Sequence, residues 1–165
     1  MKITVINTGG TFNKVYNPIS GELDVPTHHL ALQKILDVAY NLDIEPIALL
    51  SKDSLDITEN DREMLVQCIQ NCANENIIVI HGTDTMHLSA ECIAQKIEHK
   101  KIILTGAMTP MSIDEVEATM NFSLALGFLN APIQNGVYIA MHGAVISYKN
   151  IAKNKQEGKF LCKSC

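Results

Sequence analysis

Residues 77–86 read Ile77-Ile78-Val79-Ile80-His81-Gly82-Thr83-Asp84-Thr85-Met86, and they decide the fold because an apolar run gives way to a glycine turn and an amphipathic stretch. This order predicts a buried strand that passes directly into a helix. The helix start combines hydroxyl groups and a carboxylate with free backbone N–H groups, which favour a bound anion. Thr and Asp are also common helix caps, so this turn alone fits either a binding site or a capped helix.

Three other predicted strands also end in polar turns. Strands expected at residues 2–7, 44–50 and 101–104 lead into turns at 8–11, 51–56 and 105–110. Strand and helix alternate five times, and the strands are apolar rather than alternating. This pattern predicts an α/β three-layer sandwich with a mainly parallel, flavodoxin- or Rossmann-like sheet. Because ligands bind at the carboxyl ends of such strands, the four turns are expected to form one site.

The segments between these strands give further expectations. Helices are expected after Thr27, interpreted as an N-cap, after the Thr58-x-x-Asp61 pattern, and over residues 113–129. Residues 12–26 contain proline and glycine turn signals, which predict a loop and, next to a glycine turn, a candidate lid. A strand at 137–141 is expected to turn at His142-Gly143 into a hairpin.

Composition and charge limit the function classes. The chain has 165 residues, of which 47% are apolar and 19% charged, which is typical of a single globular domain spanning residues 1–165. The net charge of −5 disfavours a nucleic-acid partner. No apolar run approaches the roughly 18 residues of a membrane span, and the N-terminal residues lead straight into a strand rather than a signal peptide. The expectations are a cytoplasmic protein and no membrane partner.

The cysteines and lysines leave two questions open. Five cysteines, an odd number, favour reduced thiols, and the Cys162-x-x-Cys165 pair lacks the second pair of a zinc site, so no metal is expected. No nucleophilic-serine elbow, phosphate loop or dinucleotide fingerprint is present. Threonine, carboxylate and lysine remain, and a lysine can activate a threonine hydroxyl. Lys153 suits this role only if the basic C-terminal segment folds back over the sheet; a solvated tail is the alternative.

Three motifs together resemble the bacterial-type L-asparaginase/glutaminase family. They are Asn-Thr-Gly-Gly-Thr-Phe at 7–12, His-Gly-Thr-Asp-Thr-Met at 81–86, and Leu-Thr-Gly-Ala-Met-Thr-Pro at 104–110, compared with the family patterns TGGTI, HGTDT and GAMRP. The resemblance covers essentially the whole chain and implies the N-terminal domain of that family, with its usual C-terminal domain absent. Thr109 stands where the family has arginine.

The resemblance implies roles for individual residues. Thr11 is similar to the family nucleophile, Asp84 to the aspartate that binds the substrate amino group, and Ser54 to the serine that holds its carboxylate. Thr83 and Lys153 resemble the second threonine and its lysine partner, and Tyr16 resembles a lid tyrosine. Substrate contacts are implied for Gly10, Ser54, Leu55, Gly82, Thr83, Asp84 and Ala107, although Leu55 stands where many members have glutamine.

The implied reaction is hydrolysis of the side-chain amide of L-asparagine, or of a small analogue, to aspartate and ammonia through an acyl-enzyme. It requires no cofactor. A non-catalytic amino-acid-binding or regulatory module that keeps the same pocket is the alternative. An amidase acting on aminoacyl-tRNA or a peptide is disfavoured by the acidic charge. A homo-oligomer is expected, because an apolar face without its usual partner needs cover.

Overall fold

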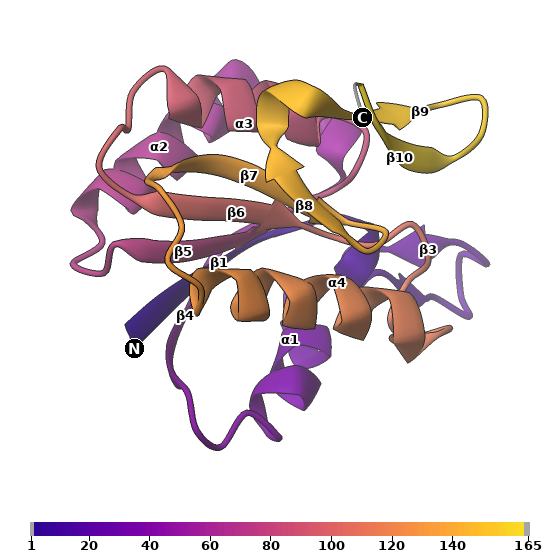
Figure 1. Cartoon of the computed structure of the whole chain (residues 1–165). Helices are drawn as coiled ribbons and strands as arrows, with labels where there is room; N and C mark the ends of the chain where they lie inside the picture. Colours follow the sequence, from indigo (N-terminus) through magenta and orange to yellow (C-terminus); the bar gives the residue numbers. More distant parts are fainter. Residues whose placement is uncertain (1, 164–165) are drawn as a thin grey trace.

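The central sheet of the computed structural model, which describes residues 2–163, has six strands in the order β4-β1-β5-β6-β7-β8. Figure 1 shows α2 and α3 on one face of this sheet and α1 and α4 on the other. The larger elements are β1 (Lys2–Gly9), α1 (Leu30–Leu36), β4 (Asp43–Lys52), α2 (Glu59–Asn71), β5 (Asn76–Ile80), α3 (Met86–Ala94), β6 (Lys101–Thr105), α4 (Glu115–Leu129), β7 (Gly136–Met141) and β8 (Ala144–Ser147). Shorter ones are η1 (Thr11–Asn13), β2 (Val15–Tyr16), β3 (Leu23–Asp24), η2 (Ser54–Asp56), η3 (Tyr148–Asn150), β9 (Ile151–Asn154) and β10 (Lys159–Cys162).

The order of the parallel strands confirms the predicted three-layer α/β fold. β4, β1, β5, β6 and β7 run parallel, and β8 is antiparallel to β7. In chain order the parallel strands lie second, first, third, fourth and fifth across the sheet, which is the flavodoxin-like arrangement. The chain leaves β1 toward one edge and returns to the other side of β1, so a switch point lies between β1 and β5. This is where such folds bind ligands.

The central strands β5 and β6 are apolar on both faces because helices cover both sides of the sheet. Alternate residues of β5 divide between two cores, with Ile77 and Val79 on the side of α2 and α3, and Ile78 and Ile80 on the side of α1 and α4. All four residues are fully buried. The apolar run that predicted a buried strand therefore forms the centre of both cores.

Side-chain caps fix two of the predicted helix starts. Thr58 and Asp61 form a reciprocal capping box at α2, as their spacing predicts. The helix predicted from residue 113 begins two residues later, at Glu115, because the Asp114 carboxylate accepts a hydrogen bond from the Val116 N–H at 2.8 Å and caps α4 there. The prediction that Thr27 caps a helix is wrong. His29 takes that position without a side-chain cap, and α1 ends at Leu36.

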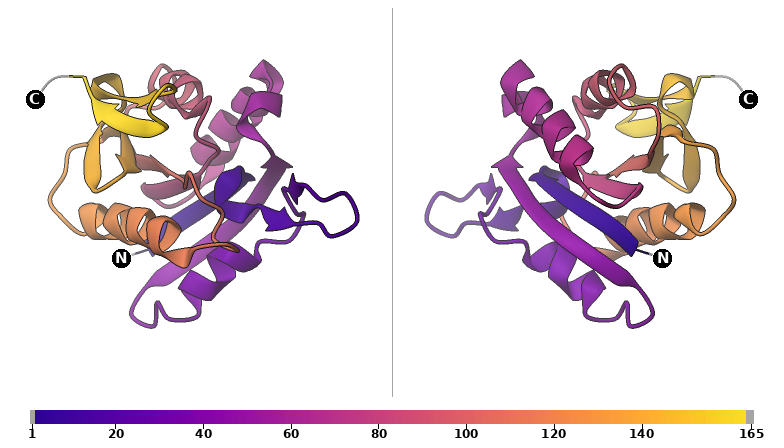
Figure 2. Two further views of the ribbon diagram at one scale, coloured as in Figure 1. Left: turned by 90° about the vertical axis from the view of Figure 1, so that its right-hand side faces the viewer. Right: turned by 90° about the vertical axis from the view of Figure 1, so that its left-hand side faces the viewer.

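Two short hairpins stand where the sequence predicted a loop and suggested a tail. Within residues 12–26, η1 is followed by a small hairpin in which β2 pairs with β3. Residues 151–162 form the second hairpin, β9–β10, rather than a solvated tail. The left view of Figure 2 faces the carboxyl edge of the sheet, and the two hairpins flank this edge on opposite sides. The third hairpin, β7–β8, was predicted and turns at His142 and Gly143, both with positive φ.

Within residues 2–163 no helix is long and apolar enough to span a membrane. Cys68, Cys72 and Cys92 are free and half-buried. Cys165, the second cysteine of the terminal pair, lies outside the described residues. No cluster of three potential metal-ligating His, Cys, Asp or Glu side chains occurs in this described part of the chain.

Gly127 offers a simple test of the α4 geometry. It is exposed in the last turns of α4, and a Cβ added there would meet nothing within 4 Å. Because alanine loses less backbone entropy in a helix than glycine does, Gly127→Ala is expected to raise the free energy of unfolding by about 0.5–1 kcal/mol. Urea denaturation measures this change. A decrease would contradict the placement of residue 127 in an exposed helix.

Candidate functional site

Two glycines bring the turns after β1 and β5 into direct contact. A Cβ placed on Gly10, whose φ is +74°, would lie 2.4 Å from the Cα atom of Gly82. Glycine is therefore required here both for its φ and for the close approach of the two backbones. Thr11 and Thr83 each follow one of these glycines by one residue, so the contact places both threonines at the switch point between β1 and β5.

Lys153 reaches this point from the β9–β10 hairpin. Its Nζ atom donates hydrogen bonds to the Thr83 hydroxyl and to the Asp84 carboxylate, both at 2.9 Å. The Lys153 side chain is only 11% exposed, whereas that of Asp84 is 32% exposed. The predicted partnership of Lys153 with Thr83 and Asp84 is thus present in the structure, and it joins residues about 70 positions apart in sequence.

Ser54 holds the turn that carries Asp84. The Ser54 hydroxyl accepts a hydrogen bond from the Asp84 N–H at 3.2 Å, and the Ser54 carbonyl accepts one from the Thr85 hydroxyl at 2.6 Å. A Cβ on Gly82 would lie 2.6 Å from the Ser54 Cβ, so the two turns pack without a gap. Ser54 itself is buried. These contacts define a strand-end site comprising Gly10, Thr11, Ser54, Gly82, Thr83, Asp84 and Lys153.

The backbone of this site retains a free donor. The Thr83 N–H makes no hydrogen bond within residues 2–163, whereas the neighbouring Asp84 N–H is occupied by Ser54. Thr11 is half-buried, and its hydroxyl likewise has no hydrogen-bond partner in the described part of the chain. A hydroxyl and an N–H group, each beside one of the touching glycines, are therefore available to a ligand.

A salt bridge that sequence analysis missed joins residues 12–26, the candidate lid, to the site. Lys14, which follows η1, lies 2.6 Å from the carboxylate of Asp53, the residue before Ser54. Burial alone would raise the pKa of Asp53, but hydrogen bonds from Lys14 and the Leu55 N–H, with the charges of Lys14 and Lys153, outweigh it and lower the pKa below its ordinary value. Asp53 is thus held as an anion beside the strand-end site. No local pattern pairs Lys14 with Asp53, because both belong to irregular segments.

Three residues implied by resemblance lie outside this set of contacts. Tyr16 is 63% exposed in β2, and its hydroxyl makes no hydrogen bond within the described residues. Leu55 is 69% exposed in η2. Ala107 is buried in the core with Phe12 and Met111, so its side chain does not face the open site. Their roles in substrate binding stay predictions.

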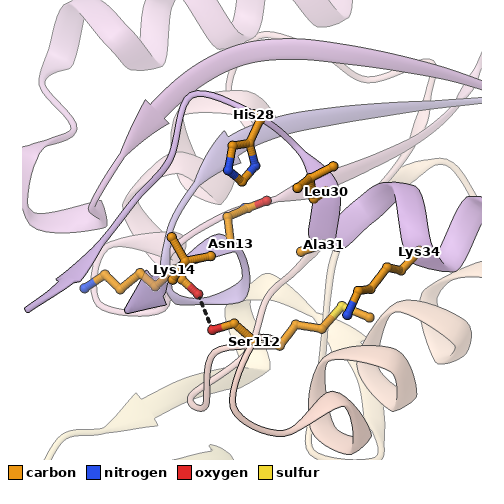
Figure 3. Close-up of a pocket in the computed structure, with 9 residues that line it drawn as sticks. Asn13, Lys14, His28, Leu30, Ala31, Lys34 and Ser112 are labelled. Carbon is orange, nitrogen blue, oxygen red and sulfur yellow. Dashed lines mark hydrogen bonds between the residues drawn. The ribbon is translucent and has the colours of Figure 1, made fainter. Parts of the chain in front are cut away.

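A separate cavity of about 190 Å³ lies under the lid region (Figure 3). It is enclosed by the segment after Thr11, by α1 and by the approach to α4, and the Ser112 hydroxyl donates to the Lys14 carbonyl at its edge. Its lining is mostly apolar and includes neither Thr11, Thr83 nor Lys153. The cavity is therefore separate from the strand-end site.

His81 supports the central turn from below. It is fully buried, with Nδ1 2.7 Å from the Gly82 carbonyl and Nε2 2.8 Å from the Ser89 hydroxyl. Because a carbonyl only accepts hydrogen bonds, Nδ1 carries the proton and Nε2 accepts from Ser89. Burial is the main reason that the pKa of His81 is lowered from 6.5 to about 4. The Gly82 hydrogen bond opposes this shift, and the charges of Arg62 and His87 add to it.

This buried imidazole makes stability depend on pH. The unfolded chain protonates residue 81 near pH 6.5, whereas the folded protein keeps it neutral down to about pH 4, so folding stability falls as the pH drops between these values. The expected loss is about 3 kcal/mol. Urea denaturation across this range would show a weaker pH dependence for His81→Gln than for the control His99→Gln, which changes an exposed histidine. Equal slopes in the two variants would contradict the assignment.

Comparisons with known proteins identify the family of the chain. A family model described as asparaginase, N-terminal, matches residues 2–159. A subunit of glutamyl-tRNA(Gln) amidotransferase from Methanococcus vannielii is 29% identical over 156 residues, which cover 87% of this chain and 34% of that protein. L-asparaginase of Thermococcus kodakarensis is 24% identical over 157 residues, covering 93% of this chain and 48% of the relative. The chain thus spans between about a third and half the length of these relatives.

Solved structures share the fold. The thermostable L-asparaginase from Thermococcus kodakarensis superimposes with a TM-score of 0.85 at 24% identity, and the match covers 98% of this chain and 51% of that one. A probable cytoplasmic L-asparaginase from Campylobacter jejuni gives a TM-score of 0.81 at 21% identity, with the same coverages. At such identity the likeness establishes the fold, whereas the family rests on the sequence match across residues 2–159. The chain therefore belongs to the asparaginase family, and the matched region is its N-terminal domain.

Proposed function

We propose that this protein is an amidohydrolase that converts the side-chain amide of L-asparagine, or of a close analogue, to aspartate and ammonia. The observation that carries the proposal is the pair of 2.9 Å contacts from Lys153 to Thr83 and Asp84 beside Thr11. A largely buried lysine between a hydroxyl and a carboxylate suits proton transfer during acyl transfer. A site that only bound an amino acid would need the carboxylate but not this lysine–threonine pair.

The first half of the reaction forms an acyl-enzyme on Thr11. Asp84 holds the α-ammonium group of the substrate with the same carboxylate that accepts a hydrogen bond from Lys153. Thr11 Oγ attacks the amide carbon, and its proton passes through Thr83 and Lys153 to the leaving nitrogen. The C–N bond then breaks, and ammonia leaves an aspartyl ester on Thr11. The Thr83 N–H stabilises the oxyanion that forms on the carbonyl oxygen.

The second half of the reaction restores the enzyme. Water attacks the ester carbon, and the bond between this carbon and Thr11 Oγ breaks. The water proton returns to Thr11, and aspartate leaves. The Thr83 N–H again faces the developing oxyanion. Every protein group that takes part in these reaction steps belongs to the strand-end site, and no further acid or base is required.

Ammonia release from L-asparagine, L-glutamine and D-asparagine tests the proposal directly. Release from L-asparagine with an equal amount of aspartate is the expected result. Rapid acid quenching followed by peptide mass spectrometry is expected to find the aspartyl group on the peptide that contains Thr11. An ester on Thr83 instead would exchange the roles of the two threonines. No ester on either peptide during turnover would contradict the acyl-enzyme.

Ammonia release, combined with a binding measurement, also separates the two alternative functions. Binding of L-asparagine by calorimetry without ammonia release would favour a non-catalytic amino-acid-binding or regulatory module. A role within a larger amidotransferase is the second candidate, because some relatives are named as subunits of glutamyl-tRNA(Gln) amidotransferase. Ammonia release that appears only with a partner protein or tRNA would favour that role. The expectations of no nucleic-acid partner, a homo-oligomer and a cytoplasmic location remain predictions.

A further inference from the structure

The hairpin that carries Lys153 is not part of the central sheet. Within residues 2–163, β9 and β10 pair only with each other, and Lys153 lies opposite Phe160 in their register. The position of the Lys153 ammonium therefore depends on what attaches this hairpin to the rest of the domain. Two buried side chains, Ile151 and Phe160, contribute to the core on the side of α2 and α3.

A directional contact outside the strand-end site supplements this apolar packing. The backbone N–H of Phe160 donates a hydrogen bond to His142 Nδ1 at 3.2 Å, and the two rings lie edge to face with centroids 6.1 Å apart. Hydrophobic packing tolerates small displacements, whereas a hydrogen bond fixes both distance and direction. The bond is made by Phe160, the residue directly across the hairpin from Lys153. It therefore restrains the backbone at the position from which the Lys153 side chain projects.

His142 is itself anchored at two further points. Its Nε2 atom lies 3.1 Å from the Glu117 carboxylate, and its backbone N–H donates to the Asn121 side chain at 2.9 Å. Glu117 also accepts hydrogen bonds from the N–H groups of Met108 and Thr109, and Asn121 donates to the Gly106 carbonyl. Glu117 and Asn121 are one turn apart on α4. The helix thereby ties the turn after β6 to the turn that carries His142.

The hydrogen-bond directions require one form of the imidazole. A backbone N–H only donates, so Nδ1 must be the unprotonated nitrogen, and Nε2 then carries the proton toward Glu117. In this form the ring accepts at one end and donates at the other, and joins α4 to the β9–β10 hairpin. Neither of these two His142 hydrogen bonds involves a residue of the strand-end site.

We infer that His142 is a positioning residue that holds Lys153 against Thr83 and Asp84 through the Phe160 N–H. The inference rests on the proposed function for its catalytic consequence, but the placement of Lys153 is measurable without turnover. In this inference, Nδ1 holds the hairpin by accepting the Phe160 N–H, whereas Nε2 contacts only Glu117. The two ends of the imidazole are therefore separable by substitution.

Three variants at position 142 make this separation. His142→Asn keeps a hydrogen-bond acceptor near the place of Nδ1 and loses the reach to Glu117. His142→Gln keeps a donor near the place of Nε2 and loses the acceptor. His142→Gly removes both groups while suiting the local φ of +51°, and so controls for backbone strain.

The first measurement is the rate at which acetic anhydride modifies Lys153 relative to Lys155, followed by peptide mass spectrometry. Lys155 is exposed on the same hairpin and serves as the internal reference. The ratio is expected to rise at least about fivefold in His142→Gln and His142→Gly, because the hairpin opens locally. His142→Asn is expected to keep the low wild-type ratio. A wild-type ratio in the Gln and Gly variants, or a raised ratio in the Asn variant, would overturn the inference.

Kinetics with L-asparagine supply the second measurement. A misplaced Lys153 is expected to lower kcat about 100-fold in the Gln and Gly variants, with KM nearly unchanged because Asp84 and Thr11 stay in place. The Asn variant is expected to restore kcat. Absence of turnover in the wild-type protein would count against the proposed function alone, since the labelling ratios still decide the role of His142. A loss of kcat without any rise in labelling would count against the inference alone.

Discussion

Lys153→Met is expected to lower kcat/KM for L-asparagine hydrolysis by about 10³-fold, as loss of a proton-transferring group commonly does. Methionine preserves much of the aliphatic side chain but cannot hydrogen-bond to Thr83 and Asp84, to which Lys153 Nζ donates in the structure. The proton of the attacking hydroxyl then has no route to the leaving nitrogen. Steady-state ammonia release measures the loss.

Lys155→Met is the matched control for this prediction. Lys155 lies two residues further along the same hairpin and is exposed, so its substitution removes the same charge without touching the strand-end site. We expect nearly unchanged activity in this variant. Equal losses in the two variants would assign the effect to the general charge of the hairpin. Full activity of Lys153→Met would remove Lys153 from the proposed chemistry.

Gly10→Ala is expected to cause a large loss of stability. The new Cβ would lie 2.4 Å from Gly82 Cα, a backbone atom that cannot rotate away, and residue 10 would keep a φ of +74°. Left-handed strain and overpacking together give an expected loss of about 3 kcal/mol or more in the free energy of unfolding. Separation of the two turns would also displace Thr11 from Thr83.

Gly21→Ala isolates the contribution of backbone strain. Gly21 has nearly the same φ, +75°, but a Cβ there meets nothing within 4 Å. The expected loss in this variant is about 1 kcal/mol, from the left-handed conformation alone. Urea denaturation of both variants gives the difference that belongs to the Gly10–Gly82 contact. Similar losses at the two positions would mean that the backbones do not touch.

The predicted α/β architecture rests on local patterns that the structure preserves. Apolar runs such as residues 77–80 are long enough to be buried on both faces, and the Thr58-x-x-Asp61 pattern caps α2 through bonds between near neighbours. Thr27 does not cap α1 because His29, two residues later, takes the N-cap position of this short helix. Several polar residues near a helix start compete for the cap, and sequence alone does not rank them.

The strand-end site was only partly predictable. Four polar turns following parallel strands must meet at one edge, and this places Thr11, Ser54, Thr83 and Asp84 in one neighbourhood from the sequence alone. The contacts of Lys14 with Asp53 and of His142 with Phe160 had no sequence signal, because each joins side chains and backbone groups from irregular or hairpin segments. Such pairings depend on how the irregular and hairpin segments pack against the carboxyl edge of the sheet.

The sequence by itself determined the layers, the parallel sheet and the edge at which polar groups gather, since these follow from hydrophobic period and chain direction. Only the tertiary structure decided whether Lys153 belongs to a solvated tail or to the site. Its placement depends on burial of Ile151 and Phe160, on one hydrogen bond to His142, and on contacts that span about 70 residues. The free energy of these long-range contacts is set by three-dimensional packing, which local residue patterns do not encode.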